Sequence, residues 1–221
     1  MVDNSEIDKL PHSIITEDVI NHDVLYKLIM VGDAGVGKSC LMLRGTRDEF
    51  KENYEMTLSV EFGSLALKID NMIVKVQIWD TAGQETFQSV AKVFYKGAQC
   101  IFLVYDITRE ETFMRLHSWI KEIRDNTSPN TMFILVGNML DLEKKRVISC
   151  ERALEFKSKE NLDGFIETSA KIGTNVQSLL IRSAKTLFTR DTEKKTGKQK
   201  AGGIIRINPA SSGKVKSGCS C

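Results

Sequence analysis

The chain has 221 residues, a length typical of one domain with short extensions. Hydrophobic residues make up 42% of it and charged residues 27%, which excludes a wholly disordered or collagen-like protein. The net charge of +2 conceals an uneven distribution, because residues 192–221 contain seven basic side chains and one acidic side chain. That segment carries +6 and the rest of the chain −4. A basic segment on an acidic body indicates a charged partner surface.

The cysteines and the apolar runs indicate a compartment. The five cysteines are odd in number and lack framework spacing, which argues for a reducing compartment and against a disulfide-stapled secreted fold. No run approaches the roughly 18–20 apolar residues that span a bilayer, and the N-terminal residues contain no signal-peptide core. Val2 stands where N-myristoylation needs glycine. We therefore expect a cytosolic protein whose membrane attachment comes from the C-terminal end.

Hydrophobic periodicity predicts one α/β domain over residues 24–190. Apolar runs rich in β-formers predict six strands, at residues 25–31, 64–69, 72–79, 100–107, 132–137 and 164–168. Amphipathic stretches predict five helices, at residues 38–46, 85–96, 110–126, 150–160 and 176–190. The short turn at Asn71 predicts a hairpin, whereas the other strands precede helices long enough for parallel crossovers. We expect a mostly parallel sheet with one antiparallel strand and helices on both faces.

Both ends of the chain are predicted to lie outside this domain. Residues 1–23 show no sustained periodicity and are expected to form a flexible extension. Residues 191–221 are rich in Lys, Gly and Ser, and are expected to form a disordered basic tail because they cannot bury enough apolar surface.

Residues 32–39, Gly-Asp-Ala-Gly-Val-Gly-Lys-Ser, match the phosphate-loop pattern G-x-x-x-x-G-K-[ST]. The segment follows a predicted strand and opens a predicted helix, as the pattern requires. Its glycines let backbone N–H groups encircle phosphate oxygens, and the helix directs its positive end at the same charge. We expect Lys38 to reach the β- and γ-phosphates and Ser39 to offer its hydroxyl to Mg²⁺.

Three later segments indicate which nucleotide is bound. Asp80 ends a predicted strand, where its carboxylate can hold Mg²⁺; after it, Gly83 can sense a γ-phosphate and Gln84 can orient an attacking water. In the segment 137–141, Asp141 is an acceptor that suits guanine N1–H and the exocyclic amino group but repels adenine N1. In the segment 167–171, the Ala170 N–H is expected to contact guanine O6. Asn138 and Asp141 therefore disfavour the alternative of a P-loop ATPase or kinase.

These motifs, in this order and spacing, resemble those of the Ras-superfamily small GTPases, and specifically the Rab family, over residues 24–190 and the last three residues. The segments 58–63, 75–80 and 103–108 are similar to Rab signatures. The resemblance implies a P-loop small G domain that binds GTP and GDP with Mg²⁺ and hydrolyses GTP slowly. It also implies a molecular switch that recruits effectors in vesicle traffic.

The resemblance assigns roles by position. Thr57 is similar to the switch threonine that binds Mg²⁺ and the γ-phosphate, Phe50 to the aromatic beside guanine, and Tyr54 to the residue that closes over the phosphates. The implied nucleotide contacts are Asp33, Ala34, Gly35, Val36, Gly37, Lys38, Ser39, Cys40, Phe50, Tyr54, Thr57, Gly83, Asn138, Met139, Asp141, Ser169, Ala170 and Lys171. The implied Mg²⁺ ligands are Ser39, Thr57 and Asp80, with Gln84 as the catalytic residue.

Effectors are expected to bind a surface that includes three aromatic residues. The implied effector and switch residues are Leu58, Ser59, Val60, Glu61, Phe62, Trp79 and Phe94. For Phe62 and Phe94, simple packing is the alternative to an effector role.

Three residues, Met139, Ser59 and Gly45, depart from the family pattern. Met139 replaces a lysine whose ammonium bonds to the phosphate loop, so we expect weaker nucleotide binding and faster exchange. Ser59 replaces a glycine and restricts the switch backbone. Ala34 is small enough to leave room for Gln84, so hydrolysis should survive. Gly45 replaces an aromatic residue, which predicts a local loss of packing.

The C-terminal residues are similar to a lipidation signal. Gly218 occupies the fourth position from the end, which excludes a C-a-a-X box, whereas Cys219 and Cys221 resemble the Cys-x-Cys signal for double geranylgeranylation. Two prenyl chains and a basic segment satisfy the requirement for stable anchoring. The location implied is the cytoplasmic face of Golgi or endosomal membranes.

The expected partners are effectors, an exchange factor, a GTPase-activating protein, a prenylation escort, a GDP-dissociation inhibitor and a membrane surface, with no nucleic acid. The alternative is a constitutive effector-binding module on a GTPase fold with an impaired nucleotide cycle. Met139 favours that alternative, whereas Gln84, Thr57 and Asp80 argue against it.

Overall fold

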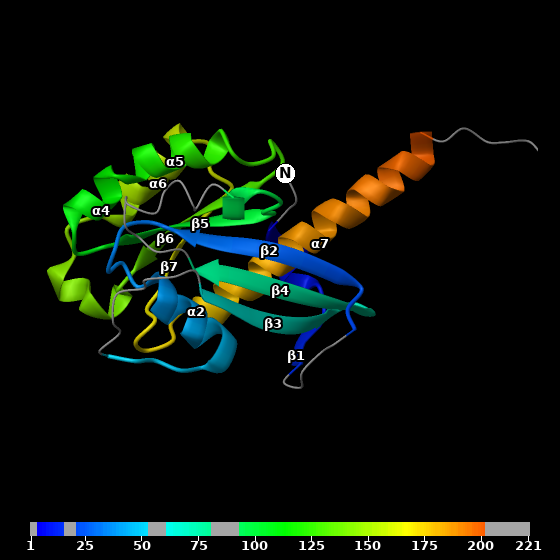
Figure 1. Ribbon diagram of the computed structural model, residues 1–221, viewed down its shortest axis with the longest axis horizontal. Coiled ribbons are helices and arrows are strands. Elements are labelled where there is room, and N and C mark those ends of the chain that lie inside the picture. The colour runs from blue at the N-terminus through cyan, green and yellow to red at the C-terminus, as the bar shows by residue number, and fades with distance from the viewer. Residues whose placement is uncertain (1–3, 16–20, 53–60, 81–92, 202–221) are drawn as a thin grey trace, which may run out of the picture.

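The computed structural model of the chain describes residues 4–15, 21–52, 61–80 and 93–201 (Figure 1). Most of the predicted helix 85–96 lies outside these residues.

One mixed sheet organises the described residues. Its strands are β1 (His12–Ile15), β2 (Val24–Val31), β3 (Glu61–Ile69), β4 (Met72–Asp80), β5 (Cys100–Asp106), β6 (Met132–Asn138) and β7 (Gly164–Glu167). They lie in the order β1-β3-β4-β2-β5-β6-β7. The pairs from β4 to β7 across the sheet are parallel, whereas β3 pairs antiparallel with β4 and β1 with β3. The predicted α/β class and the hairpin at Asn71, where Ile69 opposes Met72, are confirmed.

Helices cover both faces of the sheet. They are α1 (Asn4–Lys9), α2 (Lys38–Arg47), α4 (Glu110–Met114), α5 (Leu116–Arg124), the 3-10 helix η2 (Leu140–Lys145), α6 (Cys150–Lys159) and α7 (Val176–Ala201). Figure 1 shows α4, α5 and α6 on one face, and α2 and α7 on the other. The described part thus has seven strands and seven helices, against the six and five that we predicted. The predicted helix 110–126 is divided at Arg115, and η2 was not predicted.

Strand β5 lies at the centre of the sheet, between β2 and β6. All seven of its residues are buried, as expected for an apolar run covered on both faces. Burial of each large side chain contributes about 1.5–3 kcal/mol relative to exposure. The loops at the carboxyl end of the sheet are therefore mounted on a rigid central strand.

The prediction of a flexible extension over residues 1–23 is wrong for residues 4–15. Helix α1 packs on α7: Ile7 is only 4% exposed, the Arg182 Nε lies 3.1 Å from Asp8 Oδ1, and the Lys185 ammonium donates to the Asp8 carbonyl at 3.4 Å. Strand β1 pairs with β3 from His12 opposite Ile69 onward. A six-residue helix and a four-residue strand are too short to show a period, and their stability comes from distant partners.

The prediction of a disordered tail is wrong at its beginning, because α7 continues through Ala201. The Tyr26 hydroxyl donates to Asp191 Oδ2 at 3.1 Å, and Arg190 Nη2 lies 2.6 Å from Asp163 Oδ1. These two contacts hold the helix to the sheet at the point where the prediction ended it. None of the helices that the structure describes is both long enough and apolar enough to cross a membrane.

Gly45 does not leave the loss of packing that we predicted. It is buried in α2, and a Cβ atom there would lie 2.5 Å from Leu180 Cδ1 and 3.4 Å from Val176 Cγ1. The missing side chain lets α7 approach α2 closely, so the space is filled by α7 instead.

The docking of α1 predicts a contrast between two isoleucines. Because Ile7 is buried, Ile7→Ala should lower the free energy of unfolding by about 2 kcal/mol. Ile14, 37% exposed on β1, provides the control, and Ile14→Ala should cost about 1 kcal/mol or less. Urea unfolding of the full chain measures both values. Equal losses would contradict the docking of α1 on α7.

Candidate functional site

The residues singled out from the sequence gather at one edge of the sheet. Strands β2, β4, β5, β6 and β7 are parallel, so their carboxyl ends meet at the edge where α2 begins (Figure 1). The loops that leave this edge contain the phosphate loop, Asp80, the segment 138–141 and the segment 168–171. Open α/β sheets place their ligands in this position.

Two glycines of the phosphate loop lie where no side chain fits. A Cβ atom on Gly32 would lie 2.1 Å from the Val104 carbonyl oxygen of β5. A Cβ atom on Gly37 would lie 2.4 Å from Asn138 Nδ2, and the positive φ of 89° at this residue also favours glycine. The loop is therefore pressed against β5 on one side and against the Asn138 side chain on the other.

The Lys38 side chain lies inside the loop. It is 6% exposed, and its ammonium donates to the carbonyl oxygens of Gly32 and Asp33, both at 2.9 Å. Burial lowers the pKa of Lys38 below its ordinary value, while the nearby Asp80 and Asp33 carboxylates act in the opposite direction. A cation held in this way lies beside the backbone N–H groups that the motif directs at phosphate.

Ser39 and Asp80 form a pair of hard oxygen ligands. The Ser39 hydroxyl donates to Asp80 Oδ2, and Asp80 is fully buried. Asp80 Oδ1 is also buried, yet it has no hydrogen-bond partner among the described residues. Burial raises the pKa of Asp80 to about 6, against the opposing effects of Ser39 and Lys38. A hydroxyl beside a carboxylate with an unpaired buried oxygen fits Mg²⁺, which prefers oxygen ligands.

The segments predicted to bind the base are joined through Asn138. Its Nδ2 donates to the Val36 carbonyl in the phosphate loop at 2.8 Å. Its Oδ1 accepts from Thr168 Oγ1 at 3.3 Å and from the Ala170 N–H at 3.4 Å. Ser169 Oγ donates to Asp141 Oδ1 at 2.5 Å, so the two base segments are also bonded to each other. The structure thus brings together the phosphate loop and both predicted base segments.

Four further predicted contacts border this site. Met139 is half-buried and has a left-handed backbone, with φ of 71°, at the start of η2. Phe50 is partly buried and packs against the core that α2 and α7 form with the sheet. Lys171 is exposed and lies 3.0 Å from Glu52 Oε1, a surface pair that contributes little to stability. Cys40 is half-buried, and burial together with Asp80 raises the pKa of its thiol. The effect of Met139 on nucleotide exchange stays a prediction.

Part of the predicted site lies outside the described residues. The residues concerned belong to the two switch segments and to the C-terminal lipidation signal. They are Tyr54, Thr57, Leu58, Ser59, Val60, Gly83, Gln84, Cys219 and Cys221.

The three aromatic residues assigned to effector binding lie together. The ring centroids of Phe62 and Trp79 are 5.9 Å apart, and those of Trp79 and Phe94 are 5.6 Å apart. Phe62 is 54% exposed, whereas Trp79 and Phe94 are half-buried. The Lys27 ammonium lies 5.1 Å from the Trp79 ring centroid on the same surface. An exposed phenylalanine in such a cluster of tilted aromatic rings is available to a partner.

Sequence reasoning missed the side chains that hold these loops in place. Trp119 Nε1 donates to Asp33 Oδ1 at 3.0 Å, and Arg115 Nε lies 3.5 Å from Asp33 Oδ2. Arg44 donates to the carbonyl oxygens of Ala170, at 2.9 Å, and Lys171, at 3.1 Å. No local signal marks these residues, because their partners lie far away in the sequence.

One comparison with known proteins bears on the whole domain. A family model described as the Ras family matches residues 27–189, well over half of the chain. The matched range contains the phosphate loop, Asp80 and both base segments.

The unpaired oxygen of Asp80 predicts an unusual pH dependence. The pKa of Asp80 in the folded protein, about 6, lies above its ordinary value of 3.8, so a proton favours the folded state. This stability is complete below about pH 4 and is lost as the pH rises through 6. With nucleotide and Mg²⁺ removed by EDTA, Asp80→Asn should therefore stabilise the protein at pH 7.5 by up to about 3 kcal/mol. The gain should shrink towards pH 4.5 in urea unfolding.

Asp106 is the matched control. It is 2% exposed, but it accepts from Thr108 Oγ1 at 2.7 Å and from Arg109 Nε at 2.9 Å. Asp106→Asn should therefore destabilise the protein at pH 7.5, by about 1–3 kcal/mol. If Asp80→Asn also destabilised the protein at pH 7.5, the ionised Asp80 carboxylate would not lower the stability of the folded state as predicted.

Proposed function

Since the chain belongs to the Ras family of small GTPases, we propose that it is a Rab-type molecular switch in vesicle traffic. It binds GTP and GDP with Mg²⁺, hydrolyses GTP slowly and recruits effectors in the GTP-bound state. The observation that carries the proposal is the bonding of Asn138 to both the phosphate loop and the 168–171 segment. This bonding gives one ligand both a phosphate cradle and a base pocket.

Recognition of guanine is supported by the position of Asp141. Its Oδ1 is held by Ser169, so the carboxylate is oriented before a base arrives. Guanine presents N–H donors at N1 and at the exocyclic amino group, whereas adenine presents an acceptor at N1. An oriented carboxylate therefore selects guanine over adenine.

Hydrolysis is an in-line attack of water on the γ-phosphorus without a covalent intermediate. Lys38 stabilises charge on the phosphate oxygens, and Gln84 orients the water. Ser39, Asp80 and Thr57 would hold Mg²⁺, which would supply positive charge to offset that of the phosphates. Loss of the γ-phosphate releases the segments around Thr57 and Gly83, which ends effector binding.

Two features support the assignment to the Rab family: the aromatic cluster on the surface and the basic C-terminal segment. The aromatic cluster of Phe62, Trp79 and Phe94 suits effector contacts. The basic tail and the Cys-x-Cys ending suit a prenylated anchor on an anionic membrane surface, where each cation adds about 1 kcal/mol at best. An exchange factor, a GTPase-activating protein, a prenylation escort and a GDP-dissociation inhibitor complete the proposed cycle, on Golgi or endosomal membranes.

Gln84→Leu tests the switch directly. Because leucine cannot orient the attacking water, single-turnover hydrolysis of bound GTP should fall by about tenfold or more. GTP affinity should stay within about twofold, because Gln84 acts on the water and not on binding. Released phosphate and retained nucleotide report the two quantities. Wild-type protein that hydrolyses GTP no faster than Gln84→Leu would instead support a constitutive binding module.

The Cys219→Ser/Cys221→Ser double variant tests the anchor. In its native cell, the tagged wild-type protein should lie on membranes and carry two prenyl groups by mass spectrometry. The double variant should be released into the cytosol, because both lipid acceptors are gone. Cys150→Ser, which changes an exposed cysteine of the G domain, should remain on membranes. Unmodified Cys219 and Cys221 in the membrane-bound wild-type protein would contradict the proposal.

A further inference from the structure

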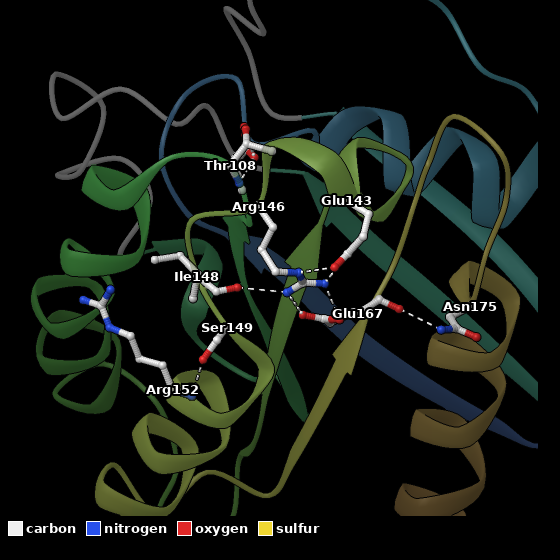
Figure 2. Close-up of polar contacts among 9 residues, drawn as sticks. Thr108, Glu143, Arg146, Ile148, Ser149, Arg152, Glu167 and Asn175 are labelled. Atoms are coloured by element: carbon white, nitrogen blue, oxygen red, sulfur yellow. Dashed lines mark hydrogen bonds and ion pairs between the residues drawn. The ribbon is translucent and has the colours of Figure 1, made fainter.

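Arg146 lies between two carboxylates, Glu143 and Glu167, as Figure 2 shows. Its Nη1 and Nη2 lie 2.6 and 2.9 Å from the two Glu167 oxygens, and its Nε and Nη2 lie 2.8 and 2.7 Å from those of Glu143. Nη1 also donates to the Ile148 carbonyl at 2.9 Å. These five bonds match the five N–H donors of a guanidinium group. The geometry is fixed in a way that a lysine could not reproduce.

The two carboxylates differ in exposure. The side chains of Arg146 and Glu167 are 17% and 13% exposed, whereas that of Glu143 is 59% exposed. The bond to Glu167 is therefore largely withdrawn from water, where loss of one partner leaves an uncompensated charge. The bond to Glu143 is mostly solvated and contributes less.

The partners of Arg146 belong to the two base segments. Glu143 lies in η2, two residues after Asp141. Glu167 ends β7 and leads directly into the 168–171 segment. The Leu140 N–H donates to the Thr168 carbonyl at 3.0 Å, so the start of η2 is bonded to the same segment. Arg146 closes the other end of this connection.

Apolar burial contributes little to the position of η2. None of its six residues is fully buried, although Leu140 packs partly against the core. Its N-cap residue, Met139, has a left-handed backbone conformation and makes no side-chain cap hydrogen bond. Because apolar burial contributes little, the position of Asp141 depends on polar contacts at both ends of η2.

From this arrangement we propose that Arg146 is a positioning residue for guanine recognition. It holds η2 against the end of β7 and so keeps the Asp141 carboxylate at a fixed distance from the 168–171 segment. The inference rests on the proposed binding of guanine nucleotides and names a residue that governs its specificity. Arg146 acts through Asp141 and does not itself touch the base.

The test compares GDP with IDP, which lacks the exocyclic amino group that Asp141 is expected to bind. In full-length Arg146→Gln, GDP dissociation should accelerate about tenfold, because η2 loses the contact to the end of β7 that, together with the Ser169 bond, positions Asp141. IDP dissociation should accelerate less, so the preference for GDP over IDP falls. Hydrolysis of bound GTP should stay within about twofold, because Lys38 and Gln84 are untouched. Arg146→Lys should give intermediate rates.

Three further variants complete the design. Glu167→Gln is made alone and in combination with Arg146→Gln. In the double variant, the acceleration of GDP dissociation should be smaller than the product of the two single effects, since both changes remove the same contact. Arg152→Gln breaks an exposed pair with Glu110, at 2.8 Å, and should leave both dissociation rates unchanged. Should Arg146→Gln fail to fold, Arg146→Lys serves for the same comparison.

Two results would overturn the inference. Equal acceleration of GDP and IDP would mean that Arg146 only stabilises the fold, and unchanged GDP dissociation would mean that it does not position Asp141. Wild-type protein that bound neither nucleotide would instead overturn the proposed function, and the inference with it.

Discussion

The carboxamide of Asn138 is the contact on which the site depends. It is 2% exposed, donates to the phosphate loop at Val36 and accepts from the segment that follows β7. Buried polar groups of this kind are costly unless they are fully bonded, so the three segments form a single arrangement. The loop can approach Asn138 only because Gly37 has no side chain. A larger residue there would separate the phosphate cradle from the base pocket.

The same edge of the sheet collects buried charge. Lys38 and Asp80 are both buried. Burial lowers the pKa of Lys38 and raises the pKa of Asp80, so it favours the uncharged form of each group. Folding alone does not require this, and an apolar pair would cost less. The charges suit a ligand that is itself highly charged, because a phosphate and its metal ion offset the desolvation when they bind. The buried charges of Lys38 and Asp80 therefore lower the stability of the ligand-free protein at the place where the ligand binds.

The sequence predicted the features that local patterns carry. The phosphate loop has a fixed spacing of residues, and the buried strands β5 and β6 appear as apolar runs. The predicted boundaries of these two strands therefore agree with the structure to within about one residue. The side chains that orient the loops, Trp119 on Asp33 and Arg146 on Glu167, were missed because each pair meets only in the folded chain. The helix break at Arg115 left the apolar stripe intact, so periodicity did not reveal it.

Helix α1 has a consequence for the order in which the protein assembles. Asp8 meets Arg182, 174 positions later in the chain. During synthesis helix α1 leaves the ribosome long before α7 exists, so its docking site is completed only when the rest of the domain has been made. The central sheet must therefore form before α1 docks, because contacts of such large separation in sequence close late. The segment that comes early in translation is among the last to reach its native place.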